Sequence, residues 1–298
     1  MQINQQNLKY SIIKILWVIF IISSTIIIPQ NLYAQNNQTR QKVKYGANPK
    51  GHFADVNNIK LYYETYGSGQ PMLIIHPNGG NIAAMSDQIK FFSPNHKVIV
   101  ADSRGHGKSE IGTGKLTYEQ MSEDFNLLLD QLNIKSVYIL GWSDGGIIGL
   151  LLAINHPDKV TKLAIMGANL NPSAAYDWAL KWAEQEFKRV NQMIEKGDKS
   201  QPWAALKQQL ELLEKQPNIP VSDLKKISVP TLVMAGDKDV IRTEHTVQIF
   251  ENLPNAHLCI FPGSTHIIPQ QNPGLFNRTV ANFFKSPYSR PDTKDLFQ

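Results

Sequence analysis

A serine in a glycine-rich turn is the residue of this chain best placed to do chemistry. Residues 141–146 read Gly-Trp-Ser-Asp-Gly-Gly, directly after an apolar run at 136–140 and directly before a small-residue-rich helical segment. Between a strand and a helix, a G-x-S-x-G sequence forces the serine hydroxyl out above the sheet. The helix that follows also directs its first N–H groups at negative charge developing beside Ser143. The turn therefore predicts nucleophilic catalysis by Ser143.

A serine nucleophile needs a base, and the base must be held by a third group. Of the eight histidines, His266 combines a late position with a loop at the carboxyl end of a strand, where open α/β sheets place their sites. Asp237 and Asp239 both follow a predicted strand. We favour Asp239, because the fourth position of a turn at 236–239 points back across the sheet edge. The order Ser143, Asp239, His266 is the Ser–Asp–His order of chains with such an elbow.

Two backbone N–H groups are expected to bind the oxyanion. One belongs to Asp144, directly after the nucleophile, and the other to Asn78 in the loop 76–81, His-Pro-Asn-Gly-Gly-Asn. The side chain of Asp144 has two interpretations. It can cap the helix that it opens, because acidic residues are favoured in a first turn. Alternatively, it faces the pocket and pairs with a cationic group of the substrate, such as an α-amino group.

Short apolar runs that alternate with helical periodicity must position these residues. Continuous apolar strands between helices predict an α/β fold with a mostly parallel central sheet flanked by helices. The expected strands are 53–56, 60–64, 71–75, 97–101, 136–140, 162–166, 231–235 and 258–261, and the expected helices include 117–132, 145–155 and 273–285.

The long interval between the strands at 162–166 and 231–235 predicts an inserted helical cap. It is too long and too periodic for a loop. We place the cap at 172–228 and the core at 51–171 and 229–285. Trp178 and Trp182 are four residues apart and share one face of a helix. They are candidate substrate contacts, and the alternative is that they pack the cap helices on one another.

The amino terminus has the pattern of an export signal. Lys9 and Lys14 precede an apolar run at 15–28, and a small residue, Ala34, lies before Gln35. This predicts a signal peptide over residues 1–34 and a periplasmic or extracellular protein. An uncleaved membrane anchor, with the catalytic domain outside the cytoplasm, is the alternative. The remaining segments are a polar linker and a polar tail, residues 35–50 and 286–298.

The composition limits the classes of partner and cofactor that the protein is expected to bind. The formal charge is +5, and without residues 1–34 it is +3, from 28 basic and 25 acidic residues with no basic run. Such a charge argues against a nucleic-acid partner. The single cysteine, Cys259, excludes an intrachain disulfide and a cysteine-based metal cluster. No phosphate-binding loop or metal-ligand spacing is visible, so no cofactor is expected, and the oligomeric state is not predicted.

Four segments resemble the α/β-hydrolase superfamily. They are the loop at 76–81, Asp-Ser-Arg-Gly-His-Gly-Lys-Ser at 102–109, the elbow, and the pair Asp239 and His266, in the expected order between residues 53 and 285. The elbow is most similar to that of the valacyclovirase-like (biphenyl hydrolase-like) branch. The chain departs from the family at Pro77, where a glycine is usual. Proline fixes φ near about −65° and removes one N–H, but the N–H of Asn78 is retained.

The resemblance implies an α/β-hydrolase fold with a helical cap. It also implies a serine hydrolase that cleaves carboxylic esters, or else thioesters or activated amides, through an acyl-enzyme, and with the export signal the protein is expected to be secreted. The serine of the elbow excludes the dehalogenase branch, which uses an aspartate there. Two alternatives remain open: carbon–carbon bond hydrolysis or perhydrolysis on the same triad, and a non-catalytic ligand-binding protein on a hydrolase scaffold.

Overall fold

The computed structural model describes residues 44–48 and 51–297. The signal peptide or anchor expected over residues 1–34 lies outside these residues. The strands are β1 His52–Val56, β2 Ile59–Tyr66, β3 Gln70–Ile75, β4 His96–Ala101, β5 Val137–Trp142, β6 Val160–Met166, β7 Thr231–Lys238 and β8 Ala256–Thr265.

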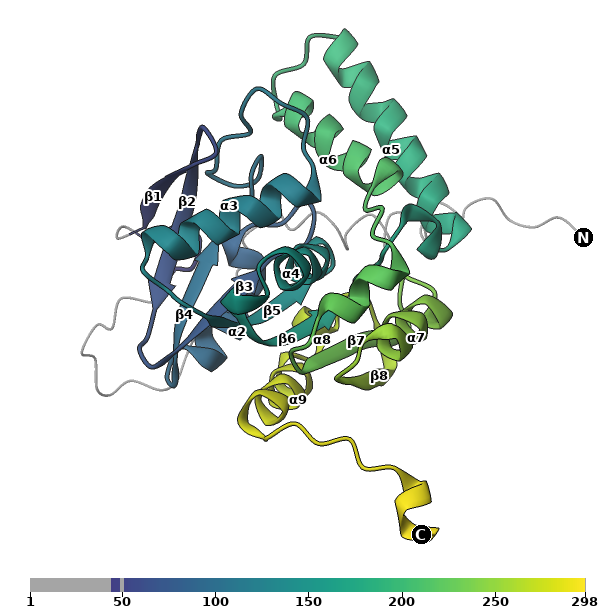
Figure 1. Cartoon of the computed structure of the whole chain (residues 1–298). Coiled ribbons are helices and arrows are strands. Elements are labelled where there is room, and N and C mark those ends of the chain that lie inside the picture. The colour runs from purple at the N-terminus through teal and green to yellow at the C-terminus, as the bar shows by residue number, and fades with distance from the viewer. Residues whose placement is uncertain (1–43, 49–50, 298) are drawn as a thin grey trace, which may run out of the picture. The chain divides into compact units, whose positions relative to one another are not determined.

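All eight strands form one sheet, in the order β1-β2-β4-β3-β5-β6-β7-β8 (Figure 1). The pairs β1–β2 and β2–β4 are antiparallel, and every other pair is parallel. The predicted mostly parallel sheet is therefore confirmed. Because β3, β5, β6, β7 and β8 run in parallel, the loops that follow them emerge at one edge, which brings together segments distant in sequence.

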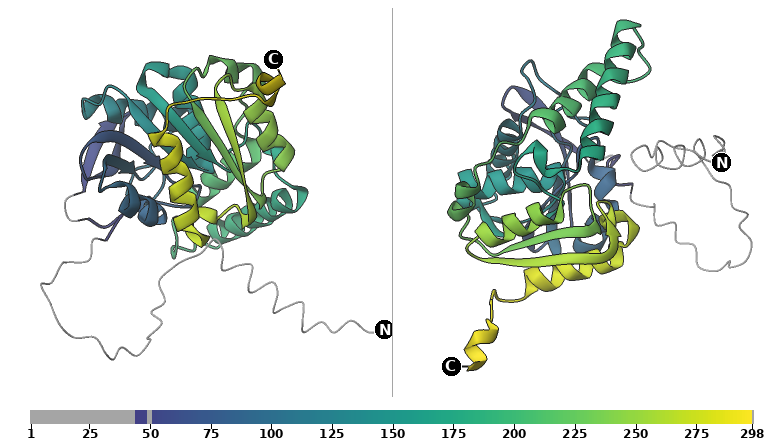
Figure 2. Two further views of the ribbon diagram at one scale, coloured as in Figure 1. Left: turned by 90° about the horizontal axis from the view of Figure 1, so that it is seen from below. Right: turned by 90° about the vertical axis from the view of Figure 1, so that its right-hand side faces the viewer.

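Helices cover both faces of the sheet. The helices of the described chain are α2 Ser86–Phe92, α3 Tyr118–Gln131, α4 Asp144–Asn155, α5 Asp177–Glu195, α6 Trp203–Lys215, α7 Thr243–Asn252, α8 Ile268–Gln271 and α9 Pro273–Lys285. Helices α3, α4 and α7 supply residues to one buried apolar cluster, and α2, α8 and α9 supply residues to the other. Figure 2 shows α9 on the face of the sheet opposite α4.

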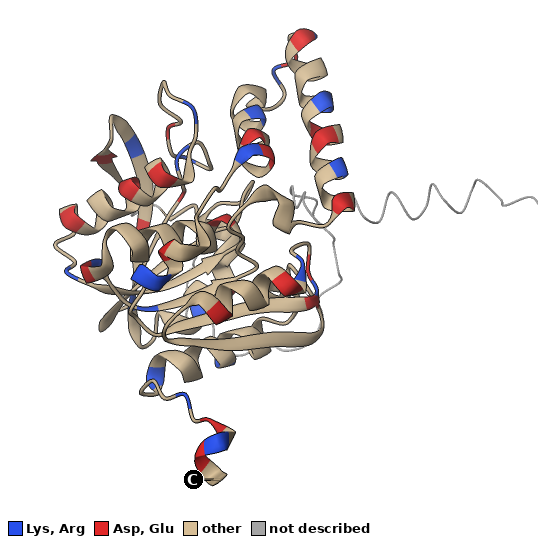
Figure 3. Cartoon of the chain, turned by 45° about the vertical axis from the view of Figure 1, so that its right-hand side comes forward, with Lys and Arg blue, Asp and Glu red and all other residues tan. Residues whose placement is uncertain are grey.

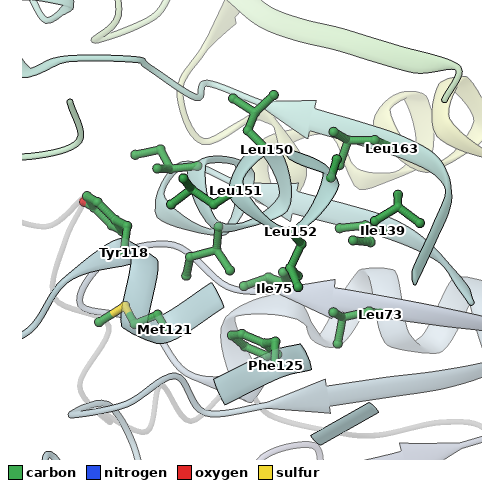
Figure 4. Packing of buried hydrophobic residues seen from close by; sticks show 14 of the residues in the cluster. Leu73, Ile75, Tyr118, Met121, Phe125, Ile139, Leu150, Leu151, Leu152 and Leu163 are labelled. Carbon is green, nitrogen blue, oxygen red and sulfur yellow. The ribbon is translucent and has the colours of Figure 1, made fainter. Parts of the chain in front are cut away.

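The core between α3, α4 and the sheet is built from the periodic apolar residues of the sequence. Phe125 of α3 and Leu152 of α4 lie over Leu73 and Ile139 of the central strands, and all four side chains are fully buried (Figure 4). Burying such a side chain contributes about 1.5–3 kcal/mol. This packing fixes the position of α4, and with it the turn at which α4 begins.

The interval 172–228 contains a helical pair, α5 and α6, flanked by the 3₁₀ turns Pro172–Ala174 and Val221–Lys226. The two helices pack on each other, with the Arg189 guanidinium over the Trp203 ring and Lys207 over the Phe187 ring. Basic and acidic residues are interspersed along both helices (Figure 3). This pair is the segment inserted in the chain between β6 and β7, which are adjacent strands of the sheet.

A buried ion pair holds the turn that follows β4. Arg104 donates to both carboxylate oxygens of Asp124 in α3, at 2.7 and 2.5 Å, and Asn57 donates to the same carboxylate at 2.8 Å. Both charged side chains are almost fully buried. Removing one partner of such a pair costs about 3–5 kcal/mol, because the other charge is left uncompensated. The arrangement fastens the β1–β2 turn and α3 to the segment 102–109.

The described part of the expected linker is fastened to the sheet. Gly46 and Asn48 each donate a backbone N–H to the buried carboxylate of Glu64, at 3.0 Å, and the Tyr62 hydroxyl donates to it at 2.6 Å. Burial alone would raise the pKa of Glu64, but these donors lower it below its usual value. Residues 44–48 therefore belong to the folded unit.

Helix α2 and the ends of several strands differ from the sequence-based expectations; β8, expected at 258–261, runs from Ala256 to Thr265. Helix α2 was not expected, because seven residues give too few helical turns to show a period. Strand β7 continues to Lys238, so the turn expected at 236–239 begins too early. Within the described ranges, no helix combines the length and the apolar character needed to cross a membrane.

Candidate active site

The turn between β5 and α4 is a sharp elbow with Ser143 at its tip. Ser143 has φ 56° and ψ −118°, a conformation that costs a non-glycine residue about 1–3 kcal/mol. Its N–H donates to the carbonyl of Met166, at the end of β6, at 2.7 Å. A Cβ atom on Gly145 would lie 2.2 Å from the carbonyl oxygen of Ile75. Only glycine there lets α4 approach the end of β3, so the predicted elbow is present.

His266 and Asp239 meet at the carboxyl edge of the sheet. The Nδ1 atom of His266, in the segment after β8, lies 2.7 Å from the Oδ1 atom of Asp239, in the segment after β7. The carboxylate of Asp239 also accepts the N–H groups of Ile241, at 3.1 Å, and Gly236, at 3.3 Å. The structure thus joins two of the predicted residues, 27 positions apart, in one hydrogen bond.

The electrostatics of this pair suit a base. Burial alone would lower the pKa of His266, but the charge and hydrogen bond of Asp239 raise it above its usual value. Burial opposes ionisation of Asp239, yet its partners lower the pKa of that carboxyl. Because an ionised carboxylate only accepts hydrogen bonds, Nδ1 of His266 carries the proton, which leaves Nε2 able to accept one.

Gly167 connects the serine to the histidine. It follows Met166, the acceptor of the Ser143 N–H, and has φ 63°. A Cβ atom on Gly167 would lie 2.6 Å from two atoms of the His266 ring. The end of β6 therefore contacts the backbone of Ser143 and the ring of His266, and a residue larger than glycine would displace the imidazole. Nothing in the sequence pattern around Gly167 indicated this contact.

Asp237, the alternative acid, has a different task. Its carboxylate is exposed and accepts the backbone N–H groups of Gly263 and Ser264, at 2.9 and 3.1 Å. These bonds lower its pKa. Asp237 holds the end of β8 against β7, and this pairing explains why β7 is longer than expected.

The loop after β3 is held in shape by His76, which is buried. Ser103 donates its N–H to Nε2 of His76 at 2.8 Å, so Nδ1 carries the proton and donates to the Pro77 carbonyl, also at 2.8 Å. Burial lowers the pKa of His76 to about 4, so the ring is neutral near pH 7. Gly80 donates to the same carbonyl at 3.0 Å. The loop is thus a fixed turn despite Pro77.

The two expected oxyanion donors border the elbow. Asp144 is the first residue of α4, and Asn78 lies opposite it, joined to it by a side-chain hydrogen bond. Within the part of the chain that the structure describes, neither backbone N–H donates to another protein group. No protein acceptor in the described residues therefore competes with an oxyanion for these two donors.

The Asp144 carboxylate makes a contact that the sequence did not predict. It is 4% exposed, and its Oδ2 accepts a hydrogen bond from the Asn78 side-chain amide at 2.8 Å. Burial raises the pKa of Asp144 to about 6, and the Asn78 hydrogen bond opposes that rise. The carboxylate lies in the first turn of α4, as the helix-capping interpretation expects, and it also binds Asn78, so both interpretations of Asp144 stay open.

The inserted helices contact the loop after β3. The Asn78 amide also donates to the backbone carbonyl of Gln209 in α6, at 3.1 Å, and the Gln209 side chain donates to the Gly105 carbonyl at 2.7 Å. Trp178, at the start of α5, is 58% exposed, and Trp182 is half-buried. Substrate contact by these two tryptophans stays a prediction.

Comparisons with known proteins agree with this architecture. A family model described as alpha/beta hydrolase fold matches residues 70–201. The chain is 26% identical to "3-oxoadipate enol-lactonase 2" of Acinetobacter baylyi, over 80% of this chain and 98% of that protein. It is also 26% identical to "Serine hydrolase BPHL" of Mus musculus, over 77% and 84%. The solved structure of an esterase (EaEST) from Exiguobacterium antarcticum superposes with a TM-score of 0.68 at 26% identity, over 79% and 100%.

The sheet order, the elbow and these similarities define the class. The chain belongs to the α/β-hydrolase superfamily, and the valacyclovirase-like resemblance of its elbow is matched by the similarity to BPHL. Its relatives are hydrolases, and we identify this protein as a hydrolase.

Proposed function

We propose that this protein is a secreted serine hydrolase that cleaves small carboxylic esters through an acyl-enzyme. The observation that carries the proposal is the 2.7 Å contact between His266 Nδ1 and Asp239 Oδ1 at the sheet edge that also bears the elbow serine. A base oriented by a buried carboxylate beside a strained serine is the arrangement that activates a hydroxyl nucleophile.

The first half of the reaction forms the acyl-enzyme. Nε2 of His266 accepts the proton of the Ser143 hydroxyl as Oγ attacks the ester carbonyl carbon. The oxyanion that forms accepts the free N–H groups of Asn78 and Asp144, which do not have to reorient as charge develops. The tetrahedral intermediate then collapses, and the departing alkoxide takes the proton from His266.

The second half returns the enzyme to its starting state. Water replaces the alcohol, gives its proton to His266 and attacks the acyl carbon. Collapse of the second intermediate releases the carboxylic acid and restores the hydroxyl of Ser143. Asp239 keeps its hydrogen bond throughout and stabilises the imidazolium that forms twice in each cycle.

Partitioning of the acyl-enzyme tests this pathway. Esters of one acid with different alcohols should give one common intermediate, so added hydroxylamine should divert the same fraction of product to the hydroxamate for every alcohol. A fraction that changes with the leaving alcohol would mean that water attacks the ester directly. The relatives named as an enol-lactonase and an esterase favour ester bonds for the first assays.

The buried charge beside the nucleophile leads to a prediction about the acyl group. If Asp144 pairs with a cation, an aminoacyl ester should have a kcat/KM at least about tenfold above that of its des-amino counterpart. Asp144 is ionised only above its pKa of about 6. The wild type should therefore prefer the aminoacyl ester at pH 7.5 and lose that preference at pH 5. Asp144→Asn should show no preference at either pH.

The ratio of the two substrates is the quantity to measure, because protonation of His266 affects both equally. Asp237→Asn is the matched control, since Asp237 is exposed and binds the backbone of residues 263–264 in β8. Equal rates for the two esters in the wild type, or a preference that survives in Asp144→Asn, would remove the amine from the proposal and leave ester hydrolysis intact.

Export leads to a separate prediction. In the native host, the mature protein should begin at or near Gln35 and be recovered from the periplasm or the medium, because Lys9 and Lys14 followed by the apolar run have the form of a cleavable signal. Amino-terminal sequencing checks this. Recovery of an intact residue 1–34 segment in the membrane fraction would show that the catalytic domain is anchored instead.

A further inference from the structure

The residue before the nucleophile makes a direct hydrogen bond to the base. Trp142 is the last residue of β5, and its side chain is buried. The indole Nε1 donates to the backbone carbonyl of His266 at 2.8 Å, and the two rings lie with their centroids 6.3 Å apart. Neighbouring residues thus present the nucleophile and hold the segment that carries the base, 124 positions further along the chain.

A plain explanation exists for the bond: a buried indole N–H needs an acceptor, and any carbonyl would serve. The particular acceptor argues for more. His266 lies between the end of β8 at Thr265 and the start of α8 at Ile268, so its carbonyl belongs to neither element. In the described part of the chain this carbonyl accepts no other hydrogen bond. The Trp142 indole is therefore the anchor of the His266 backbone at this point.

The other contacts of His266 do not set the distance between its backbone and the end of β5. Asp239 sets the rotation and the proton position of the ring, and Gly167 supports the ring from the end of β6. Neither contact ties the backbone of His266 to the elbow, and the pairing of the neighbouring Thr265 with Lys238 ties it to β7 only. The Trp142 indole spans that interval, and Ser143 is attached to the next position of the same strand end.

We propose that Trp142 is a positioning residue that sets the distance between the Ser143 hydroxyl and the His266 imidazole. The inference rests on the proposed serine mechanism and adds to it a residue that acts through the backbone of the base. Since burial, Asp239 and the charge of Asp144 together set the pKa of the ring, Trp142 should govern how fast the proton is transferred and not the pH at which the base becomes neutral.

Trp142→Phe tests the proposal, because it keeps an aromatic ring and deletes the N–H. We expect kcat for ester hydrolysis to fall about tenfold with KM within about twofold, since small displacements of reacting groups cost rate more than binding. The acid-side inflection of the pH profile should stay where it is in the wild type. Labelling of the serine by a fluorophosphonate should slow by a similar factor.

Trp203→Phe is the matched control. Trp203 is also buried, and its indole donates to the Asp198 carboxylate at 2.7 Å within the α5–α6 pair, away from the base. This variant should keep the wild-type kcat. If Trp142→Phe destabilises the fold too far to assay, a benzothienyl analogue of tryptophan at position 142 deletes the N–H with the ring shape retained.

Each outcome has a definite meaning. Wild-type kcat in a folded Trp142→Phe protein, a shifted pH inflection, or an equal loss in Trp203→Phe would overturn the positioning role. A wild-type enzyme whose serine is never labelled would instead refute the serine mechanism itself, so failure of the inference and failure of the proposed function are distinguishable.

Discussion

Replacing Ser143 with alanine is expected to lower kcat for ester hydrolysis by at least about 10⁴-fold. The variant loses the atom that forms the acyl-enzyme, so the remaining turnover comes from substrate binding and the oxyanion donors alone. The fold should be unchanged, because the strained backbone of the elbow is held by Met166 and by packing around Gly145 rather than by the hydroxyl.

Ser173→Ala serves as the control for this substitution. Ser173 is exposed, and its hydroxyl donates only to the Asn171 side chain in a turn before α5. It should hydrolyse esters at the wild-type rate. Substantial activity in purified Ser143→Ala, with the circular dichroism spectrum and Tm of the wild type, would mean that another group is the nucleophile.

The second large effect is expected at the acid. Asp239→Asn should reduce kcat by about 10³–10⁴-fold, because an amide in place of the carboxylate favours the wrong tautomer of His266 and no longer stabilises its charged form. Asp237→Asn should cost less than about tenfold, since that side chain binds only the backbone of residues 263–264 in β8. Comparing kcat of the two variants on one ester distinguishes the acids directly.

The pH dependence of the hydrolysis rate is a second test of the pair Asp239 and His266. Asp239 raises the pKa of His266, and activity needs the neutral base, so the wild-type rate should increase with pH through a raised inflection. In Asp239→Asn the inflection should move to lower pH while the plateau falls. If Asp237→Asn moved the inflection and Asp239→Asn did not, the assignment of the acid would be reversed.

The sequence predicted the parallel sheet because its strands are continuous apolar runs such as 71–75 and 162–166, which need cover on both faces. It located the elbow because the glycines leave few other conformations for a strand–turn–helix junction. Helix α2 escaped prediction because its seven residues include only three large apolar side chains. The length of β7 was underestimated because Asp237, read as a turn residue, binds across to the next strand.

The site was predictable where chemistry constrains residue type and not where it depends on long-range contacts. Chain order and position at strand ends were enough to select His266 and Asp239. The partner of Asp144 was not predictable, because the Asn78 amide lies 66 residues away and joins it only when the sheet forms. The same holds for the indole of Trp142 on the His266 carbonyl. Such contacts carry no local periodicity or motif.

The most direct test of the account is to react the purified protein with a fluorophosphonate and locate the adduct by mass spectrometry. The account predicts one adduct per chain, on the peptide that contains Ser143, with labelling abolished in Ser143→Ala and strongly slowed in Asp239→Asn. An unlabelled wild-type protein that is folded and binds ester analogues would contradict it and indicate a ligand-binding protein on a hydrolase scaffold. An adduct on a different residue would contradict the assignment of Ser143 as the nucleophile.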